Sequence, residues 1–176
     1  MIELQARQFE GRREFLDTLR QALLQACAED RTQLYCLDSS FSDWPWSDVE
    51  VLAALKRWAR PGRLLHLLAE QYEDLARLQP RFVQWRATWG HCVHARAYGP
   101  EALAAVGPSG PAALFFWSED GRQLNVASAF SIRLHDKRLW RGAASVALSE
   151  VSRSKDYFDA LAQRSEESFA STTLGL

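Results

Sequence analysis

Hydrophobic positions in the first part of the chain follow two different spacings. Over Gly11–Ala28, apolar residues recur at steps of three and four with charged and amide residues between them, which predicts an amphipathic helix. Leu34–Leu37 and Leu64–Leu68 are instead short unbroken apolar runs, a pattern typical of strands that are covered on both faces. A second helix is predicted between these strands, over Asp48–Ala59, with Ser47 at its amino end in capping-box spacing.

The alternation continues further along the chain. A short helix is predicted over Glu70–Leu78, followed by a third strand at Phe82–Arg86 and an extended segment at His91–Arg96. Strands that alternate with helices in short units predict an α/β fold. We therefore expect a single domain over residues 1–176, built on a mixed sheet with a largely parallel core and with helices on both faces.

Residues 112–129 carry the pattern of a β-hairpin. An apolar, aromatic run leads to the pair Asp120-Gly121, which suits a tight turn, and a second extended run follows. The segment Gly99–Pro111, rich in small residues, is predicted to be a surface loop with a single turn inside it. Ile2–Leu4 is predicted as an edge strand, and a closing helix is predicted to be capped by Ser154.

The composition is that of an ordinary globular chain. The hydrophobic fraction is 47%, the charged fraction is 24%, and the formal net charge is −1. A charge so close to zero argues against a general binder of nucleic acids or of anionic membranes. The three cysteines lack C-x-x-C spacing and fit free thiols in a reducing cytoplasm. No apolar stretch has the length of a membrane span, and the seven tryptophans are expected mainly in the core.

Two groups of side chains are candidates for a site. Loops at the carboxyl ends of parallel strands are the usual place for a ligand in an α/β fold, so a pocket is predicted there. Its residues are Asp38, Ser39, Glu70 and Asp120. A second group is either a solvated basic surface or an anion-binding site, because arginine can make two parallel hydrogen bonds to a phosphate or a carboxylate. Its residues are Arg133, His135, Lys137, Arg138 and Arg141.

The pattern around the histidines predicts no metal and no cofactor. On a helix, His91 and His94 would share a face and could bind a metal ion together. In the extended segment predicted here, their odd separation puts them on opposite faces. No third ligand stands nearby at a familiar spacing.

The order of the elements, together with the hairpin, resembles a single phospholipase D-like half-domain from an uncharacterised bacterial family. Active members of that superfamily carry His-x-Lys-x-x-x-x-Asp leading into the hairpin, where the histidine attacks phosphorus and the lysine neutralises phosphate oxygens. Aligned on Asp120, this chain has Ala113 in the place of the histidine and Phe115 in the place of the lysine. A second alignment, on His135-x-Lys137, puts Gly142 where the aspartate is required.

The resemblance implies a pseudoenzyme: a non-catalytic phospholipase D-like domain that binds an anion, another small ligand or a protein, and that pairs with a second copy of itself. On this interpretation no nucleic acid is expected as a partner. Two alternatives remain open. A phosphodiesterase or phosphatidyl transferase would use His135 and Lys137, or a site built from His91 or His94. An anion- or nucleic-acid-binding module would use the cluster at 133–141, and its binding would fall steeply with salt.

Overall fold

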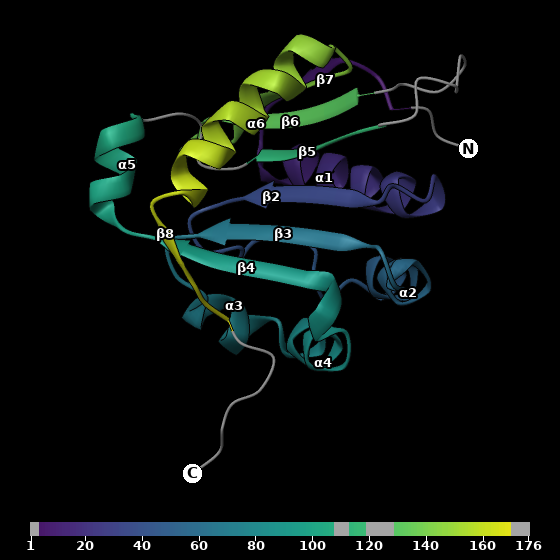
Figure 1. Ribbon diagram of the computed structural model, residues 1–176. Helices are drawn as coiled ribbons and strands as arrows, with labels where there is room; N and C mark the ends of the chain where they lie inside the picture. The colour runs from purple at the N-terminus through teal and green to yellow at the C-terminus, as the bar shows by residue number, and fades with distance from the viewer. Residues whose placement is uncertain (1–3, 108–112, 119–128, 170–176) are drawn as a thin grey trace.

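The computed structural model describes residues 4–107, 113–118 and 129–169 (Figure 1). Within these residues the chain forms one mixed sheet of eight strands, in the order β1-β7-β6-β5-β2-β3-β4-β8. The predicted α/β class, the mixed sheet and the cover of helices on both faces are confirmed. The predicted hairpin turn at Asp120-Gly121 lies outside the described residues.

Three neighbouring strands near the centre of the sheet run parallel, and the others run antiparallel to their neighbours. β2, β3 and β4 form the parallel group. β5 and β6, the two arms of the predicted hairpin, pair antiparallel, and β5 joins the group along β2. The parallel part is smaller than expected, because the chain after β4 builds the sheet with antiparallel strands. The strands are β1 (Arg7–Phe9), β2 (Gln33–Leu37), β3 (Leu64–Ala69), β4 (Val93–Tyr98), β5 (Ala113–Trp117), β6 (Ala129–Asp136), β7 (Arg141–Ser145) and β8 (Ser165–Glu167).

Helices cover the two faces of the sheet unequally. α1 to α4 lie on one face, where the larger apolar core forms. α6 lies across β5 and β6 on the other face, with α5 beside one end of it (Figure 1). None of the described helices is long and apolar enough to cross a membrane. The helices are α1 (Arg12–Ala28), α2 (Val49–Trp58), α3 (Glu73–Leu78), α4 (Pro80–Thr88), α5 (Pro100–Val106) and α6 (Leu148–Ala162), with a 3-10 turn η1 at Gly90–Cys92.

The elements from α1 to β3 lie at nearly the predicted bounds, with one correction at a helix cap. α2 is capped by Asp48 and not by Ser47. The Asp48 carboxylate accepts hydrogen bonds from the backbone N–H groups of Glu50 and Val51, both at 3.0 Å. Aspartate satisfies two N–H groups that have no partner within the helix, so it takes the cap position.

The predicted strand at Phe82–Arg86 is wrong, because these residues lie in α4. This helix begins at Pro80, and proline is favoured in the first helical turn. Phe82 and Trp85 are three residues apart, so they share one face of the helix, and both are buried. The third parallel strand is β4, which falls in the segment predicted to be extended.

Three further predictions differ in their bounds. The edge strand is β1 instead of Ile2–Leu4, of which only Leu4 is described and is not in a strand. α6 begins at Leu148, and Ser154, the predicted cap, is buried inside it. The turn expected within 99–111 is the helix α5.

The aromatic loop after β2 is part of the core. Trp44 and Trp46 are buried, and their rings stack at 5.5 Å between centroids. Phe41 meets the Trp44 ring edge-on at 5.0 Å, and Phe82 stacks on Trp46 at 4.7 Å. The predicted core position is therefore confirmed for these tryptophans, which join the loop to α4.

Candidate functional site

The carboxyl ends of β2 and β3 bring three of the predicted pocket residues together. Asp38 follows β2 directly, and Glu70 follows β3 directly. The backbone carbonyl of Ser39 accepts a hydrogen bond from the backbone N–H of Glu70 at 3.0 Å. The fourth predicted residue, Asp120, lies outside the described residues.

The Asp38 carboxylate is buried and anchors the loop after β2. Its Oδ2 accepts hydrogen bonds from the N–H groups of Phe41 (2.8 Å) and Ser40 (3.3 Å). Phe41 has a φ of 57°, a left-handed conformation that bulky residues rarely adopt. Lys137 Nζ lies 3.6 Å from Oδ1. Burial raises the pKa of Asp38, while the charge of Lys137 and the backbone N–H groups oppose that shift.

Substitutions of Asp38 separate its hydrogen bonds from its charge. Asp38→Ala removes the acceptor for the buried N–H of Phe41 and the partly buried N–H of Ser40, so we expect the free energy of unfolding to fall by roughly 2 kcal/mol. Asp38→Asn keeps an oxygen acceptor and removes a buried charge, so we expect a loss below about 1 kcal/mol. Urea unfolding measures both losses. Equal losses in the two variants would contradict the role of Asp38 as a loop anchor.

The predicted anion site after β6 is not a free cluster of cations. Lys137 lies between the carboxylates of Asp38 and Asp43. Arg141 forms an ion pair with Glu10 at 2.7 Å. Carboxylates that already hold these cations compete with any incoming anion. The predicted members without an ion pair in the described part of the chain are Arg133, His135 and Arg138.

The two residues of the main enzymatic alternative face different surroundings. His135 lines a cavity of about 510 Å³ beside β1, together with Glu10 and Glu14. Lys137 is directed to Asp38 and also lies over the Trp140 ring at 5.0 Å. A histidine and a lysine that act on one phosphate must converge on it. The structure does not bring these two together.

The other catalytic candidates are also separated. His91 is in η1 and His94 is in β4. Among the described residues, no three side chains of His, Cys, Asp or Glu are grouped so that they could hold a metal ion. Phe115 is buried in the core and stacks on Tyr35 at 5.0 Å between centroids.

A second basic stretch, which the sequence interpretation missed, lies at the amino-terminal edge of the parallel strands. Between Glu50 and Glu70 the chain has no acidic residue, and this run is a signal that could have been found. Its cations begin in the last turn of α2 and continue through the loop to β3. We call residues 56–63 the basic segment. Its cations are Lys56, Arg57, Arg60 and Arg63.

One carboxylate faces the basic segment in the described part of the chain. Arg60 pairs with Asp30, and Arg63 Nη2 lies 3.2 Å from the same carboxylate. Arg63 also donates a hydrogen bond to the backbone oxygen of Asp30 at 2.7 Å. Lys56 and Arg57 are exposed and form no ion pair with any described residue. The basic segment therefore keeps an excess of positive charge at the surface.

Beside the basic segment, part of the sheet is uncovered. α6 crosses β5 and β6, and together with α5 it also covers the carboxyl ends of β3 and β4, where Leu68 and Tyr98 are buried; no described helix lies over the amino-terminal ends of β3 and β4 on this face (Figure 1). Residues on four strands lie in one row across this face, from Phe115 on β5 through Tyr35 and His66 to His94. We call the part of this surface next to the basic segment the open sheet face. Its residues are Gln33, His66, His94 and Trp117, and they surround the ring of Tyr35, which is buried and meets Phe158 of α6 edge-on.

The rings of the open sheet face form a continuous group. Tyr35 stacks on His66 at 4.4 Å and on Trp117 at 5.3 Å between centroids. The His94 ring is turned by 84° relative to His66, at 5.5 Å. His94 is exposed, and Lys155 of α6 holds its ammonium 5.4 Å from the centre of the Tyr35 ring.

His66 is a neutral member of this group at pH 7. Gln33 Oε1 accepts hydrogen bonds from Tyr35 Oη (2.8 Å) and from His66 Nε2 (3.1 Å). Burial, together with the nearby charges of His94 and Lys155, lowers the pKa of His66 to about 4. With its proton on Nε2, His66 keeps Nδ1 as a hydrogen-bond acceptor.

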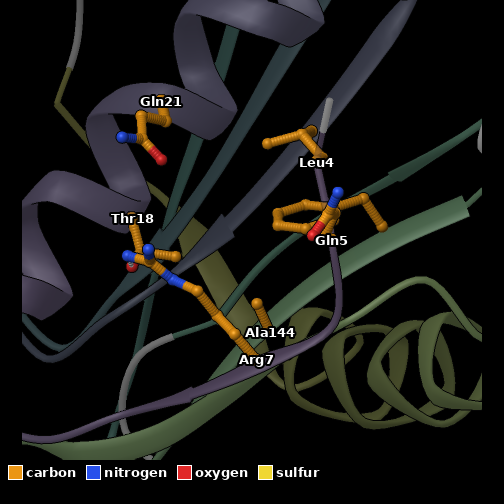
Figure 2. Close-up of a pocket in the computed structure, with 7 residues that line it drawn as sticks. Leu4, Gln5, Arg7, Thr18, Gln21 and Ala144 are labelled. Carbon is orange, nitrogen blue, oxygen red and sulfur yellow. Dashed lines mark hydrogen bonds between the residues drawn. The ribbon is translucent and has the colours of Figure 1, made fainter. Parts of the chain in front are cut away.

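A separate cavity of about 370 Å³ lies between α1 and the segment that enters β1 (Figure 2). Figure 2 shows Arg7 extending toward Thr18 of α1, and its guanidinium donates a hydrogen bond to the Thr18 hydroxyl. That hydroxyl donates in turn to the backbone oxygen of Glu14 at 2.7 Å. The cation of this cavity is thus engaged with the helix, and the lining side chains include no histidine, cysteine or carboxylate.

No family model matches the sequence, and no curated protein is similar to it. The fold is similar to that of TrmBL2, an archaeal chromatin protein whose structure shows a novel mode of DNA binding. The TM-score is 0.53 at 15% sequence identity, which shows a shared fold. The similarity covers 94% of this chain and 54% of TrmBL2, so the chain spans about half the length of that protein.

This comparison contradicts two expectations from the sequence. A phospholipase D-like domain that binds a small ligand or a protein is not supported, because the fold is shared with a DNA-binding chromatin protein. The expectation that nucleic acid is not a partner is contradicted by the same finding. It rested on the net charge of the whole chain, which does not reveal a local excess such as the basic segment. The predicted pairing with a second copy gains no support from the comparison.

Proposed function

We propose that this chain binds nucleic acid, with the basic segment as its contact to the phosphate backbone. The observation that carries the proposal is the charge balance there, because the segment has four fixed cations and one carboxylate among the described residues, that of Asp30, pairs with two of them. Lysine and arginine bind phosphates by Coulomb attraction and by release of counterions, whatever the base sequence. The proposal keeps the predicted binding of nucleic acid through cations, but it places the contact at the basic segment and not at residues 133–141.

The arrangement of the basic segment suits a polyanion. Lys56 and Arg57 lie in the last turn of α2, and Arg60 and Arg63 follow in the loop to β3, so the cations continue along one edge of the sheet (Figure 1). The Arg60 side chain stays 51% exposed while it pairs with Asp30. An exposed pair of this kind contributes little stability, so a phosphate can compete for the guanidinium.

The shared fold supports the proposal from a different direction. Nearly the whole of this chain corresponds to about half of TrmBL2, which is described as a DNA-binding chromatin protein. One fold serves many functions, so the likeness alone does not say which surface makes contact. The charge balance of the basic segment is the reason for placing the contact there.

Salt-dependent binding to a labelled duplex DNA tests the proposal. If the three exposed cations Lys56, Arg57 and Arg60 contact phosphates, the logarithm of the binding constant should fall with the logarithm of salt concentration at a slope of about −3. The double variant Lys56→Gln, Arg57→Gln removes the two unpaired cations, which are exposed, so the fold should be kept. We expect it to bind at least about tenfold more weakly, with a slope shallower by about 2. Fluorescence anisotropy measures both quantities.

A matched control removes two cations from the other basic stretch. Arg138→Gln with Arg141→Gln lowers the net charge by the same amount, and we expect it to bind as the unaltered protein does. Loss of binding in this control alone would move the contact to the turn between β6 and β7. Absence of any salt-dependent binding by the unaltered protein would overturn nucleic-acid binding itself.

A further inference from the structure

The open sheet face combines one exposed ring, that of His94, and the two partly exposed rings of His66 and Trp117 with polar groups. His94 is exposed, and among the described aromatic side chains its ring contacts only His66. Trp117 and His66 are partly exposed at the border of the ring group. Neighbouring side chains cover a ring that packs in the core, but the His94 ring is largely open to solvent. A ligand can therefore contact it.

We infer that the open sheet face binds the unpaired bases of a single-stranded polynucleotide, an inference that rests on the nucleic-acid binding proposed above. Proteins bind unpaired bases by stacking them on aromatic or imidazole rings, which a sheet displays side by side. His94 supplies an exposed ring for such a stack, and Trp117 supplies a second at the far side of Tyr35.

Two polar groups on this face have no hydrogen-bond partner among the described residues and can meet the edge of a base. The amide nitrogen of Gln33 is a donor, because its oxygen already accepts hydrogen bonds from Tyr35 and His66. His66 Nδ1 is an acceptor. A donor and an acceptor on adjacent strands match the mixed edges that bases expose when they are not paired.

The basic segment and Lys155 lie at two borders of the rings. The segment ends at Arg63, whose side chain is held by Asp30 and which precedes His66 by three residues, about 10 Å along an extended strand. On the other side, Lys155 of α6 lies over the Tyr35 ring and pairs with Asp159. A strand whose phosphates follow the basic segment can therefore turn its bases onto the sheet. In a duplex the base faces are stacked on one another, so they cannot reach these rings.

Binding of single strands and of duplex tests the inference. The probes are labelled oligo(dT) and oligo(U) of about 12 nucleotides, in the size range of single-strand binding sites, and the oligo(dT)·oligo(dA) duplex of equal length. We expect a single strand to bind at least about tenfold more tightly than the duplex, and His94→Ala to weaken single-strand binding by about tenfold. His94→Phe should restore it, because the benzyl ring also stacks. His91→Ala removes another exposed histidine outside the face and should bind as the unaltered protein does.

The outcomes separate this inference from the proposed function. Equal affinity for single strand and duplex, or unchanged single-strand binding by His94→Ala, overturns the inference and leaves binding by the basic segment in place. Binding to neither probe overturns both. Preference for either single-stranded probe over the duplex supports the inference.

Discussion

Replacing Gly142 with alanine is expected to lower the free energy of unfolding by roughly 3 kcal/mol or more. Gly142 lies in β7, in register with Phe9 of β1 and Leu134 of β6. A Cβ atom there would lie 2.2 Å from the backbone oxygen of Arg133 and 2.6 Å from the Phe9 ring. The carbonyl is held in the sheet, and the buried Phe9 ring packs on Phe15, so neither neighbour can give way easily.

A loss of stability in Gly142→Ala is opposite to what the glycine-to-alanine change usually does in a strand. Alanine is otherwise favoured over glycine inside a strand by about 0.5–1 kcal/mol, so a loss of stability must come from the close packing. Gly99→Ala is the matched control, because nothing lies within 4 Å of its Cβ position and its φ of −94° suits alanine. We expect the control to change stability by less than about 0.5 kcal/mol. Urea unfolding measures both, and a Gly142→Ala variant as stable as the unaltered protein would contradict the packing of β1 against β7.

The titration of His66 alone is expected to lower the free energy of unfolding by about 2 to 3 kcal/mol as the pH falls from 6.5 to 4. Its pKa is about 4 in the folded protein and 6.5 in its ordinary state. Between these values the unfolded chain binds a proton at this histidine and the folded chain does not. The contribution of His66 is therefore complete above pH 6.5 and is lost as the pH falls. Burial is the main cause, with His94 and Lys155 adding to it and Asp159 opposing it.

The variant His66→Gln isolates this titration. Its free energy of unfolding should fall less between pH 6.5 and pH 4 than that of the unaltered protein. The slopes are compared and not the absolute stabilities, because the substitution also removes the stack on Tyr35 and the hydrogen bond to Gln33. Parallel profiles for His66→Gln and the unaltered protein would disprove the lowered pKa.

Local patterns predicted most elements of the first half of the chain, because each is recorded within a short window. α1 and β2 follow from the spacing of apolar residues that a helix or a covered strand requires. The error at Phe82–Arg86 arose because a five-residue apolar pattern fits either a strand or one side of a helix. Pro80 and the spacing of Phe82 and Trp85 favour the helix only when the window is extended.

The site was harder to predict than the fold. The expectation that loops after parallel strands meet at one edge of the sheet correctly placed Asp38 near Glu70. Asp38 was predicted to line a pocket, but its hydrogen bonds to the following loop make it an anchor for that loop. Both basic stretches contain four fixed cations, and the one at 133–141 also contains His135 and was the predicted anion site. Two of its cations, Lys137 and Arg141, are paired with carboxylates that are far away in sequence, such as Glu10 for Arg141. The resemblance to phospholipase D-like domains and the single domain over 1–176 stay predictions.

Spacing of apolar residues along the chain was enough to establish the α/β class, the order of the early elements and the aromatic core, since these depend on contacts between near neighbours and on burial of one face. The tertiary structure decided which cations remain unpaired, because it brings cations and carboxylates that are far apart in sequence close together in space, where Coulomb attraction acts. Asp30 neutralises part of the basic segment, and Tyr35, His66 and His94 become one surface only when β2, β3 and β4 lie side by side.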